Sequence, residues 1–547
     1  MARCVGDVMG CLVDSTGVAP AAPSTMSELF RGNTMSNQSG ISLLARMGQR
    51  KTVAHVQRET QTSELKRTLG PWNLVFLGIG CIIGAGIFVR TGNAAALHAG
   101  PAVLLSFVIA GVVCAFAGLC YAELSSTLPV SGSAYTYSYA TVGEFAAWIM
   151  GALLLLEYGL AASVVAVGWG GYMVSLLRDF GIIIPPELTG PYGHVLMKNG
   201  VALLGANGAP LTSIFNLPAF LICMSLAALL VIGVSESATV NNVIVAVKLT
   251  VIIAFIVIVG WYVIERFDTL KANWDPFIPP PSGAKGEFGW SGVFRAASIV
   301  FFAYIGFEAV STAGQEAKDP KKDMPFGIIG SLLICTVIYI LVSIVMTLIV
   351  NYKQLDVPDP VAVAVDALGP QWGWFAKLVK VGAIIGLTSV VLVLMYGQTR
   401  IFYSMARDGL LPRVFSVVHP TLKTPWINTI LVGLITAIAA ALFDINTLGD
   451  MTSVGTLAAF AIVCVSVIWL RKTHPELPRG FTVPLYPVLP ALGVLSCVGL
   501  IFSVENRVLI FFAWYSVAAV VLYFLYGMRN SRLYLGLDNV DRSTPRS

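Results

Sequence analysis

Three charged side chains lie inside long apolar runs, where a charge is costly and therefore informative. Lys248 lies in the run IVAVKLT, Glu157 in LLLEYG, and Glu308 at the end of FFAYIGFE. A charged side chain at membrane depth costs roughly 2.5–3.5 kcal/mol on insertion scales, so such residues mark binding sites or ion pathways by default. An ammonium can donate to carbonyl oxygens and a carboxylate can hold a cation or a proton, and this is the chemistry that we expect here.

Two of these charged residues, Lys248 and Glu308, also have a simpler interpretation. Lys248 can snorkel to the membrane surface, but the edge of its span at Asn242 lies roughly 10 Å away, which is too far for an easy reach. Glu308 can cap a broken helix through backbone N–H groups, and the sequence leaves that role and a functional one equally open. We expect Glu157 to contribute to the substrate region or to act as a proton partner.

Two glycine-containing stretches are poor helices inside apolar runs. The first is IIGAGIF, with Gly84 and Gly86, and the second is FFAYIGFE, with Gly306 before Glu308. A helical glycine costs about 1 kcal/mol relative to alanine, and an opened turn in lipid needs partners for its backbone groups. Close helix packing is the structural alternative. Because the stretches are five spans apart, they predict an inverted repeat with a binding site between two broken helices.

Composition places the chain among membrane proteins. It has 547 residues, of which 56% are hydrophobic and only 12% charged, against roughly 25% charged residues in soluble domains. Apolar runs of about 20 residues predict an all-α polytopic protein in a lipid bilayer. Twelve spans are predicted, at 71–93, 101–124, 141–176, 214–234, 240–264, 291–314, 326–350, 374–404, 426–443, 451–470, 484–503 and 508–527.

These spans divide the chain into five predicted parts. They are a disordered cytoplasmic segment (1–68), a first repeat with helices 1–5 (69–264), a second repeat with helices 6–10 (265–470), helices 11–12 (471–530) and a cytoplasmic tail (531–547). Lys and Arg are denser in the short loops on the side of the amino terminus, which predicts that both termini are cytoplasmic.

Several motifs in a fixed order carry a family resemblance. They are GCIIGAGIF (80–88), PVSGSAYTYSY (129–139), FAYIGFE (302–308), YGQTR (396–400) and ARDGLLP (406–412). Together they resemble the amino acid–polyamine–organocation superfamily, and within it most of all the cationic amino acid transporter family and its bacterial members. The resemblance covers about 65–526 and implies a secondary active transporter of alternating access in a bacterial inner (plasma) membrane.

The resemblance also implies a substrate site. The N–H groups of Ala85 and Gly86 would bind the substrate carboxylate, and carbonyls near Ile82, Phe302, Ala303 and Ile305 would bind its amine. Some bacterial relatives have threonine at the position of Ala85, so this chain lacks that hydroxyl donor.

Two further roles follow from the same resemblance. Phe302 would be a gate. Lys248 would occupy the place where sodium-coupled relatives hold an ion, and would couple transport to protons.

We therefore expect a sodium-independent, proton-coupled permease that favours cationic amino acids, with a broad small neutral (alanine-type) transporter or an amino acid exchanger as alternatives. Basic residues are spread over short connections, so no nucleic-acid partner is predicted. The five histidines lie outside the deep spans without HExxH spacing and the nine cysteines form no CxxC pair, so we expect no metal, no cofactor and no embedded enzyme. No filter-like repeat supports a channel. A sensing role stays open, and the oligomeric state is not predicted.

Overall fold

The computed structural model describes a helical protein. It covers residues 47–50, 67–130, 133–195, 197–198, 201–202, 210–233, 238–283 and 286–533, and the described residues fall in one compact unit, Met47–Ser547. The predicted disordered segment 1–68 lies outside the described residues apart from 47–50 and 67–68, as does the predicted tail 531–547 apart from 531–533.

α-Helices account for most of the described chain. They are α4 (Pro71–Ile82), α5 (Thr91–Ala94), α6 (Val103–Thr127), α7 (Ser133–Thr141), α8 (Glu144–Leu154), α9 (Ala161–Asp179), α10 (Leu217–Ile232), α11 (Ala238–Glu265), α12 (Phe267–Leu270), α13 (Gly289–Val300), α14 (Pro320–Ile349), α15 (Pro360–Asp366), α16 (Gly373–Arg407), α17 (Trp426–Leu442), α18 (Ile445–Thr473), α19 (Val488–Phe502), α20 (Asn506–Leu522) and α21 (Met528–Asn530).

Shorter turns connect or interrupt these helices. The π-helical turns are η1 (Gly86–Arg90), η2 (Ala95–Ala99), η4 (Leu155–Leu160) and η12 (Tyr523–Gly527). The 3₁₀ turns are η3 (Gly100–Ala102), η5 (Pro186–Leu188), η6 (Lys271–Trp274), η7 (Phe301–Tyr304), η8 (Phe307–Gln315), η9 (Tyr352–Gln354), η10 (Pro370–Trp372) and η11 (Arg413–Ser416). Two-residue strands, β1 (Met197–Lys198) and β2 (Val201–Ala202), pair antiparallel in a loop.

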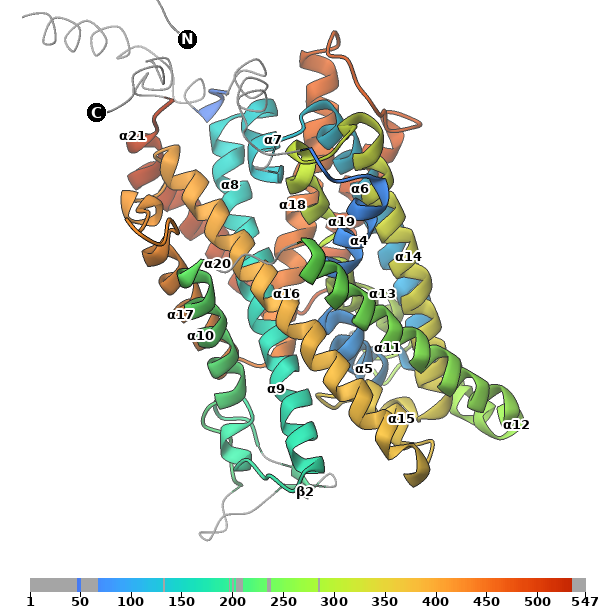
Figure 1. Cartoon of the computed structure of the whole chain (residues 1–547). Coiled ribbons are helices and arrows are strands. Elements are labelled where there is room, and N and C mark those ends of the chain that lie inside the picture. The colour runs from blue at the N-terminus through green and yellow to red at the C-terminus, as the bar shows by residue number, and fades with distance from the viewer. Residues whose placement is uncertain are drawn as a thin grey trace, which may run out of the picture. The chain divides into compact units, whose positions relative to one another are not determined.

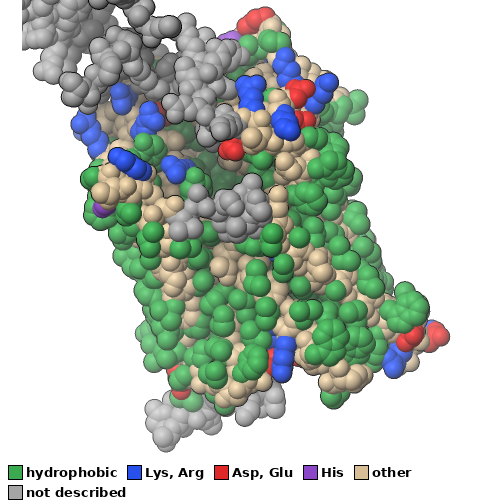
Figure 2. All heavy atoms as spheres, viewed as in Figure 1, with side chains coloured by type: hydrophobic (Ala, Val, Ile, Leu, Met, Phe, Trp, Pro, Cys, Tyr) green, Lys and Arg blue, Asp and Glu red, His purple; other side chains and the backbone are tan. Residues whose placement is uncertain are grey.

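The outer surface fits a lipid environment. In the described part of the chain, eight helical stretches are long and apolar enough to cross a membrane, and four further apolar helices are shorter. Large apolar side chains such as Trp261, Ile264 and Leu495 are exposed. Figure 2 shows hydrophobic side chains across the middle of one face, with Lys and Arg toward its ends. This confirms the predicted class, an all-helical membrane protein.

Unbroken helices surround two interrupted ones. α14 packs along α4 and α6, while α16 packs along α9 and α11. Figure 1 shows α4 and α5 in the interior, with α11, α14 and α16 around them. The interrupted pair is α4 with η1, and α13 with η7 and η8; η1 and η7 contact each other. The two interruptions therefore lie against each other in the interior of the helical bundle.

The backbone leaves helical geometry at both glycine-containing stretches. α4 ends at Ile82, and Ile83 is extended (φ −73°, ψ 101°). α13 runs into η7, after which Ile305 is extended (φ −57°, ψ 129°) and Gly306 has φ 121°. A φ of 121° is a conformation that glycine adopts at little cost. Both interruptions thus occur at the stretches that the sequence singles out.

Candidate functional site

The first break exposes carbonyl oxygens that Lys248 satisfies. Its Nζ donates to Gly80 O at 2.8 Å and to Ile83 O at 3.2 Å. The side chain is 1% exposed, so the ammonium points into the protein and does not snorkel to the membrane surface. A cation at the carbonyl end of a helix is also favoured by the helix dipole. α11 therefore contributes a fixed positive charge to the end of α4.

A glycine on α16 makes room for this lysine. A Cβ atom on Gly386 would lie 3.0 Å from Lys248 Cγ, 3.3 Å from Cδ and 3.4 Å from Cε. Such contacts are tighter than ordinary van der Waals packing, so a side chain at this position would press on the lysine stem. Gly386 was not found from the sequence because nothing local distinguishes it from other glycines in the apolar spans.

The second break is held by a carboxylate. The Gly306 N–H donates to both carboxylate oxygens of Glu308, at 3.1 and 2.9 Å. Glu308 is 1% exposed. A carboxylate that accepts from an opened N–H group is a charge-assisted hydrogen bond, which is stronger than a neutral one. This geometry is the capping arrangement, one of the two roles that the sequence leaves open for Glu308.

The two breaks touch through their backbones. A Cβ atom on Gly86 would collide with Cα of Ala303. Reciprocally, a Cβ atom on Gly306 would lie 2.7 Å from the carbonyl carbon of Cys81. Each break thus offers one glycine to the backbone of the other, and larger residues at these two positions would push the broken helices apart.

Tyr339 of α14 bridges the breaks. Its hydroxyl lies 3.0 Å from Ile82 O and 3.0 Å from Ala303 O, and can donate to either. Tyr339 is fully buried. Sequence reasoning missed this residue because a tyrosine in an apolar span carries no charge and is most often a packing residue.

A cavity opens where the breaks meet. Its free volume is about 10 Å³, which is room for about one water molecule. Its lining consists of Cys81, Ile82, Gly84, Ala85, Gly86, Ala161, Val165, Phe302, Ile305, Val390 and Leu394. The side chains are apolar apart from the cysteine thiol, so most of the polar groups available here belong to the opened backbone.

Most of the predicted site residues therefore come together. Ile82, Ala85, Gly86, Phe302 and Ile305 line the cavity with Gly84. The predicted Ala303 does not line it, although its carbonyl shares Tyr339 with that of Ile82.

The three predicted charged residues stand outside the cavity lining. Lys248 and Glu308 bind the backbone of the breaks, as described above. Glu157 lies in the π-helical turn η4, one helical turn before the lining residue Ala161. π-helical turns inside α-helices are frequent at functional sites.

Glu157 is buried beside Glu308. It is 0% exposed, and neither carboxylate oxygen has a well-formed hydrogen bond within the described residues. Its carboxyl group approaches that of Glu308 and interacts with it electrostatically. Gln398 of α16, one turn beyond the lining residue Leu394, is equally buried and its amide atoms lack partners in the described part of the chain. A buried unpaired polar group costs about 1–3 kcal/mol, which marks this end of the cavity as a polar site.

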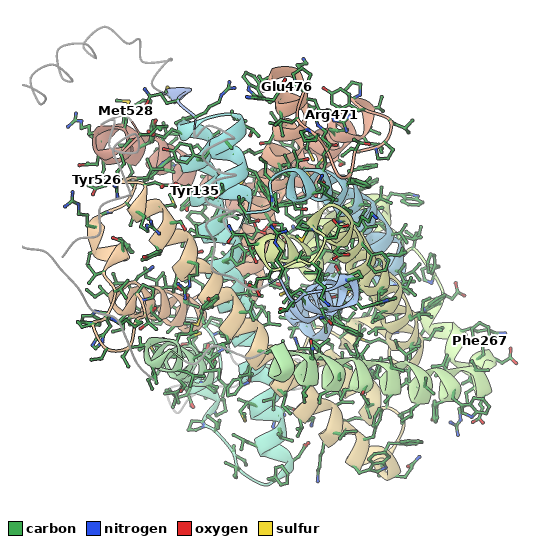
Figure 3. All side chains as sticks on the ribbon, turned by 45° about the horizontal axis from the view of Figure 1, so that its top comes forward. Tyr135, Phe267, Arg471, Glu476, Tyr526 and Met528 are labelled. Atoms are coloured by element: carbon green, nitrogen blue, oxygen red, sulfur yellow. The ribbon has the colours of Figure 1, made fainter. Side chains whose placement is uncertain are left out.

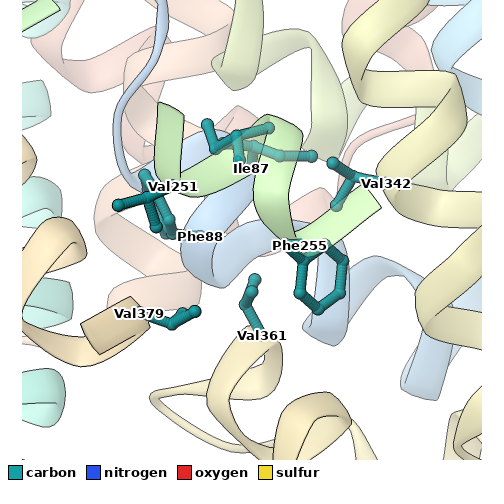
Figure 4. Close-up of a pocket in the computed structure, with 8 residues that line it drawn as sticks. Ile87, Phe88, Val251, Phe255, Val342, Val361 and Val379 are labelled. Atoms are coloured by element: carbon teal, nitrogen blue, oxygen red, sulfur yellow. The ribbon is translucent and has the colours of Figure 1, made fainter. Parts of the chain in front are cut away.

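A second cavity lies beside the first break and is wholly apolar. Its free volume is also about 10 Å³, and it is lined by Ile87, Phe88, Val251, Ile252, Phe255, Val342, Val361 and Val379 (Figure 4). Hydrophobic side chains alone cannot orient an ammonium and a carboxylate. The cavity between the breaks is therefore the better candidate for a polar substrate.

Charged side chains connect helices at one end of the bundle, near the breaks. Arg90 of η1 donates to Asp450 of α18 at 2.9 Å and to Asn446 at 2.7 Å, and Arg295 of α13 pairs with the same Asp450. The structure buries Arg90 completely. Gly449 permits this, because a Cβ atom there would lie 2.7 Å from Arg90 Cζ.

A second polar network lies on the side where α7 and α21 are found. Glu123 of α6 pairs with Arg471, and also with Arg479 at 3.4 Å. Tyr135 of α7 donates to Asp408 at 2.8 Å. Tyr135 and Arg471 lie on this side together with Tyr526 and Met528, whereas Phe267, in α12, lies apart from them (Figure 3). Buried polar groups thus tie helix ends together on both sides of the central cavity.

Comparisons with known proteins show the family of the chain. A family model described as amino acid permease matches residues 69–526. A methylthioribose transporter of Bacillus subtilis is 43% identical over 484 residues, which cover 88% of this chain and 98% of the relative. A branched-chain amino acid permease of the same organism is 44% identical over 470 residues, which cover 86% and 95%.

Cationic transporters are more distant relatives. A vacuolar cationic amino acid transporter of Arabidopsis thaliana is 37% identical over 423 residues, covering 77% of this chain and 66% of that protein. All these relatives are named as transporters or permeases, and the resemblance drawn from the motifs is confirmed. The chain is an integral membrane permease rather than an enzyme, and it belongs to the amino acid permease family of the amino acid–polyamine–organocation superfamily.

Proposed function

We propose that the chain is a secondary active permease for neutral amino acids with small or branched aliphatic side chains. The observation that carries this proposal is the apolar lining of the cavity between the two breaks. Backbone groups there can recognise the ammonium and carboxylate common to all amino acids, and the apolar side chains favour an aliphatic substrate. The branched-chain permease among the relatives supports the same substrate class.

Backbone recognition would work through opposite ends of half-helices. Ala85 and Gly86 begin the second half of the first broken helix, where N–H groups have no intrahelical acceptor and the dipole favours an anion. We assign the substrate carboxylate to them. We assign the ammonium to the carbonyls of Ile82, Phe302, Ala303 and Ile305.

Coupling and gating complete the proposed cycle. Lys248 holds the carbonyls of the first break as a bound cation would, so we infer that transport is sodium-independent and that protons drive it. Phe302 lines the cavity and is 5% exposed, and we propose it as the gate. Alternating access would rock helices around the two breaks.

We further propose twelve spans with a five-plus-five inverted repeat. The first repeat would comprise 69–264 and the second 265–470, with helices 11–12 in 471–530 and both termini cytoplasmic in a bacterial plasma membrane. Eight long and four shorter apolar helices support the count. Interruptions in the first and sixth predicted spans support the repeat.

A cationic substrate is the second candidate, because Glu157 is buried one helical turn from the lining residue Ala161, and its carboxyl oxygens make no well-formed hydrogen bond among the described residues. Its carboxylate could hold an ammonium or guanidinium at the end of a long side chain. An exchanger of amino acids would use the same site and differ in its coupling.

Uptake by purified protein in liposomes tests these proposals. We expect labelled leucine and alanine to enter without sodium, faster with an inward proton gradient, and we expect arginine to compete poorly. Arginine uptake that exceeds leucine uptake would favour the second candidate. Strict sodium dependence would remove the proposed role of Lys248, and flux only against internal amino acid would indicate an exchanger.

A further inference from the structure

Tyr339 stands at the junction of both breaks. We propose that Tyr339 is a positioning residue for the substrate ammonium: its hydroxyl, which can donate to Ile82 O or to Ala303 O, lies between two carbonyls whose spacing fits one primary ammonium group. The site would therefore discriminate against analogues in which the amine is missing or substituted. This inference rests on the proposed amino acid site and specifies which side chain sets its geometry.

The first argument is the distance between the two carbonyls. Each oxygen lies 3.0 Å from the same hydroxyl oxygen, so the two are no more than 6.0 Å apart. An ammonium nitrogen that donates to two carbonyls at tetrahedral directions needs them roughly 4.7 Å apart, given ordinary hydrogen-bond lengths. The spacing imposed by Tyr339 is compatible with such a chelated ammonium.

The second argument is hydrogen-bonding capacity. A carbonyl oxygen has two lone pairs, and a tyrosine hydroxyl has one proton to donate. Tyr339 therefore cannot saturate Ile82 O and Ala303 O, and each oxygen retains capacity for a donor from the substrate. An ammonium has three N–H donors and can serve both oxygens at once.

The third argument is rigidity. The Tyr339 ring is fully buried and packs against Phe107, with ring centroids 5.5 Å apart, and against Tyr304, with centroids 5.7 Å apart. The hydroxyl therefore cannot swing to water, and the carbonyls of the two breaks are held through a side chain that is itself fixed. A preorganised site discriminates better than one that must rearrange on binding.

Tyr304 provides a matched control. Its ring lies beside that of Tyr339, it is also fully buried, and its hydroxyl donates to Phe107 O at 2.8 Å. Tyr304→Phe thus removes the same kind of buried hydroxyl–carbonyl bond on a neighbouring ring, but its acceptor lies on α6 and not on a break.

The experiment compares wild type, Tyr339→Phe and Tyr304→Phe in liposomes. It measures KM and maximal rate for leucine, and inhibition by N-methylleucine and by 4-methylpentanoate, which lacks the amine. For Tyr339→Phe we expect KM to rise about tenfold, as for loss of one net hydrogen bond at a charged group. We also expect the preference for leucine over both analogues to fall about fivefold or more, with a maximal rate within about twofold of wild type. Tyr304→Phe should leave KM and the preference unchanged.

Each other outcome is decisive. Equal KM and equal preference in wild type and Tyr339→Phe would overturn the proposal, as would equal losses in both variants, since these would indicate a packing role. Failure of Tyr339→Phe alone to fold, seen as a collapsed thermal transition, would assign the hydroxyl to stability and likewise overturn it. Absence of leucine uptake and of thermal stabilisation by leucine in wild type would instead remove the proposed function itself.

Discussion

In both breaks, a side chain satisfies backbone groups that the interrupted helix leaves without partners, but the two side chains carry opposite charges. In the first, opened carbonyls of α4 meet the ammonium of Lys248; in the second, the opened N–H of Gly306 meets the carboxylate of Glu308. The backbone acceptors of the first break thus bind a charged donor, and the backbone donor of the second break binds a charged acceptor. The bilayer interior offers no water to satisfy these groups.

The origin of the two charges differs as well. Glu308 is two residues from the N–H that it binds, whereas Lys248 is 168 residues from Gly80. The second break can therefore satisfy itself locally, and the first depends on another helix. This difference predicts that the first break is the more vulnerable to substitution and the one through which α11 can influence the site.

Removing the cation from the first break should have the largest effect. Lys248→Met leaves Gly80 O and Ile83 O without their donor, and each buried unpaired group costs about 1–3 kcal/mol. We expect leucine uptake to fall by about 100-fold or more and the thermal unfolding temperature to drop. Lys271→Met, at an exposed lysine, should change neither quantity. Near-normal uptake by Lys248→Met would show that the two breaks do not need opposite charges.

Substitution of Gly306, in the second break, should have the next largest effect on uptake. Gly306→Ala forces an alanine to φ 121° and places its Cβ 2.7 Å from Cys81, so the broken helices must separate or strain. We expect a loss of about 30-fold in uptake and lower stability, at about 1–3 kcal/mol of backbone strain plus the collision. The control is Gly373→Ala, which meets no atom within 4 Å. Comparable behaviour of the two alanine variants would contradict the close backbone contact.

Neutralising the second break should be milder. Glu308→Gln keeps one oxygen acceptor for the Gly306 N–H but removes the charge, and a charged hydrogen bond exceeds a neutral one by about 1 kcal/mol. We expect uptake to fall about fivefold, less than for Lys248→Met. Uptake assays on the two variants side by side check the ranking, and a reversed order would mean that the second break is the more fragile.

The smallest effect is expected from the glycine behind Lys248. Gly386→Ala puts a methyl group 3.0 Å from Lys248 Cγ, so the lysine stem must give by a few tenths of an ångström. We expect about a threefold lower uptake with the fold intact, because small overpacking is partly relieved by a flexible side chain. A combined Gly386→Ala and Lys248→Met protein should be no worse than Lys248→Met alone. Additive losses would place the effect of Gly386 elsewhere.

The sequence predicted those structural features that depend on residues close together in the chain. Apolar runs gave the membrane class, and glycines marked the stretches where the backbone leaves helical geometry. Glu308 lies in the motif that it caps, so a capping role was already visible as an alternative.

Features that depend on long-range packing escaped prediction. Tyr339 is 257 residues from Ile82, and Arg90 is 360 residues from Asp450. No pattern in one sequence pairs such positions, so Arg90, Tyr339 and Gly386 were not singled out. The π-helical turn at Glu157 was missed for a different reason. It lies between two α-helices of the same span, and a single π-helical turn leaves the hydrophobic periodicity of the span almost unchanged.

The shared carboxylate of Asp450 has a mechanical consequence. Arg90 belongs to the half of the first broken helix that follows its break, and Arg295 to the half of the second that precedes its break; both bind Asp450. If one half-helix moved without the other, either Arg90 or Arg295 would lose its ion pair with Asp450. Breaking a buried ion pair costs about 3–5 kcal/mol. Both half-helices are therefore connected to α18 through Asp450, and we expect them to move together as one rigid body.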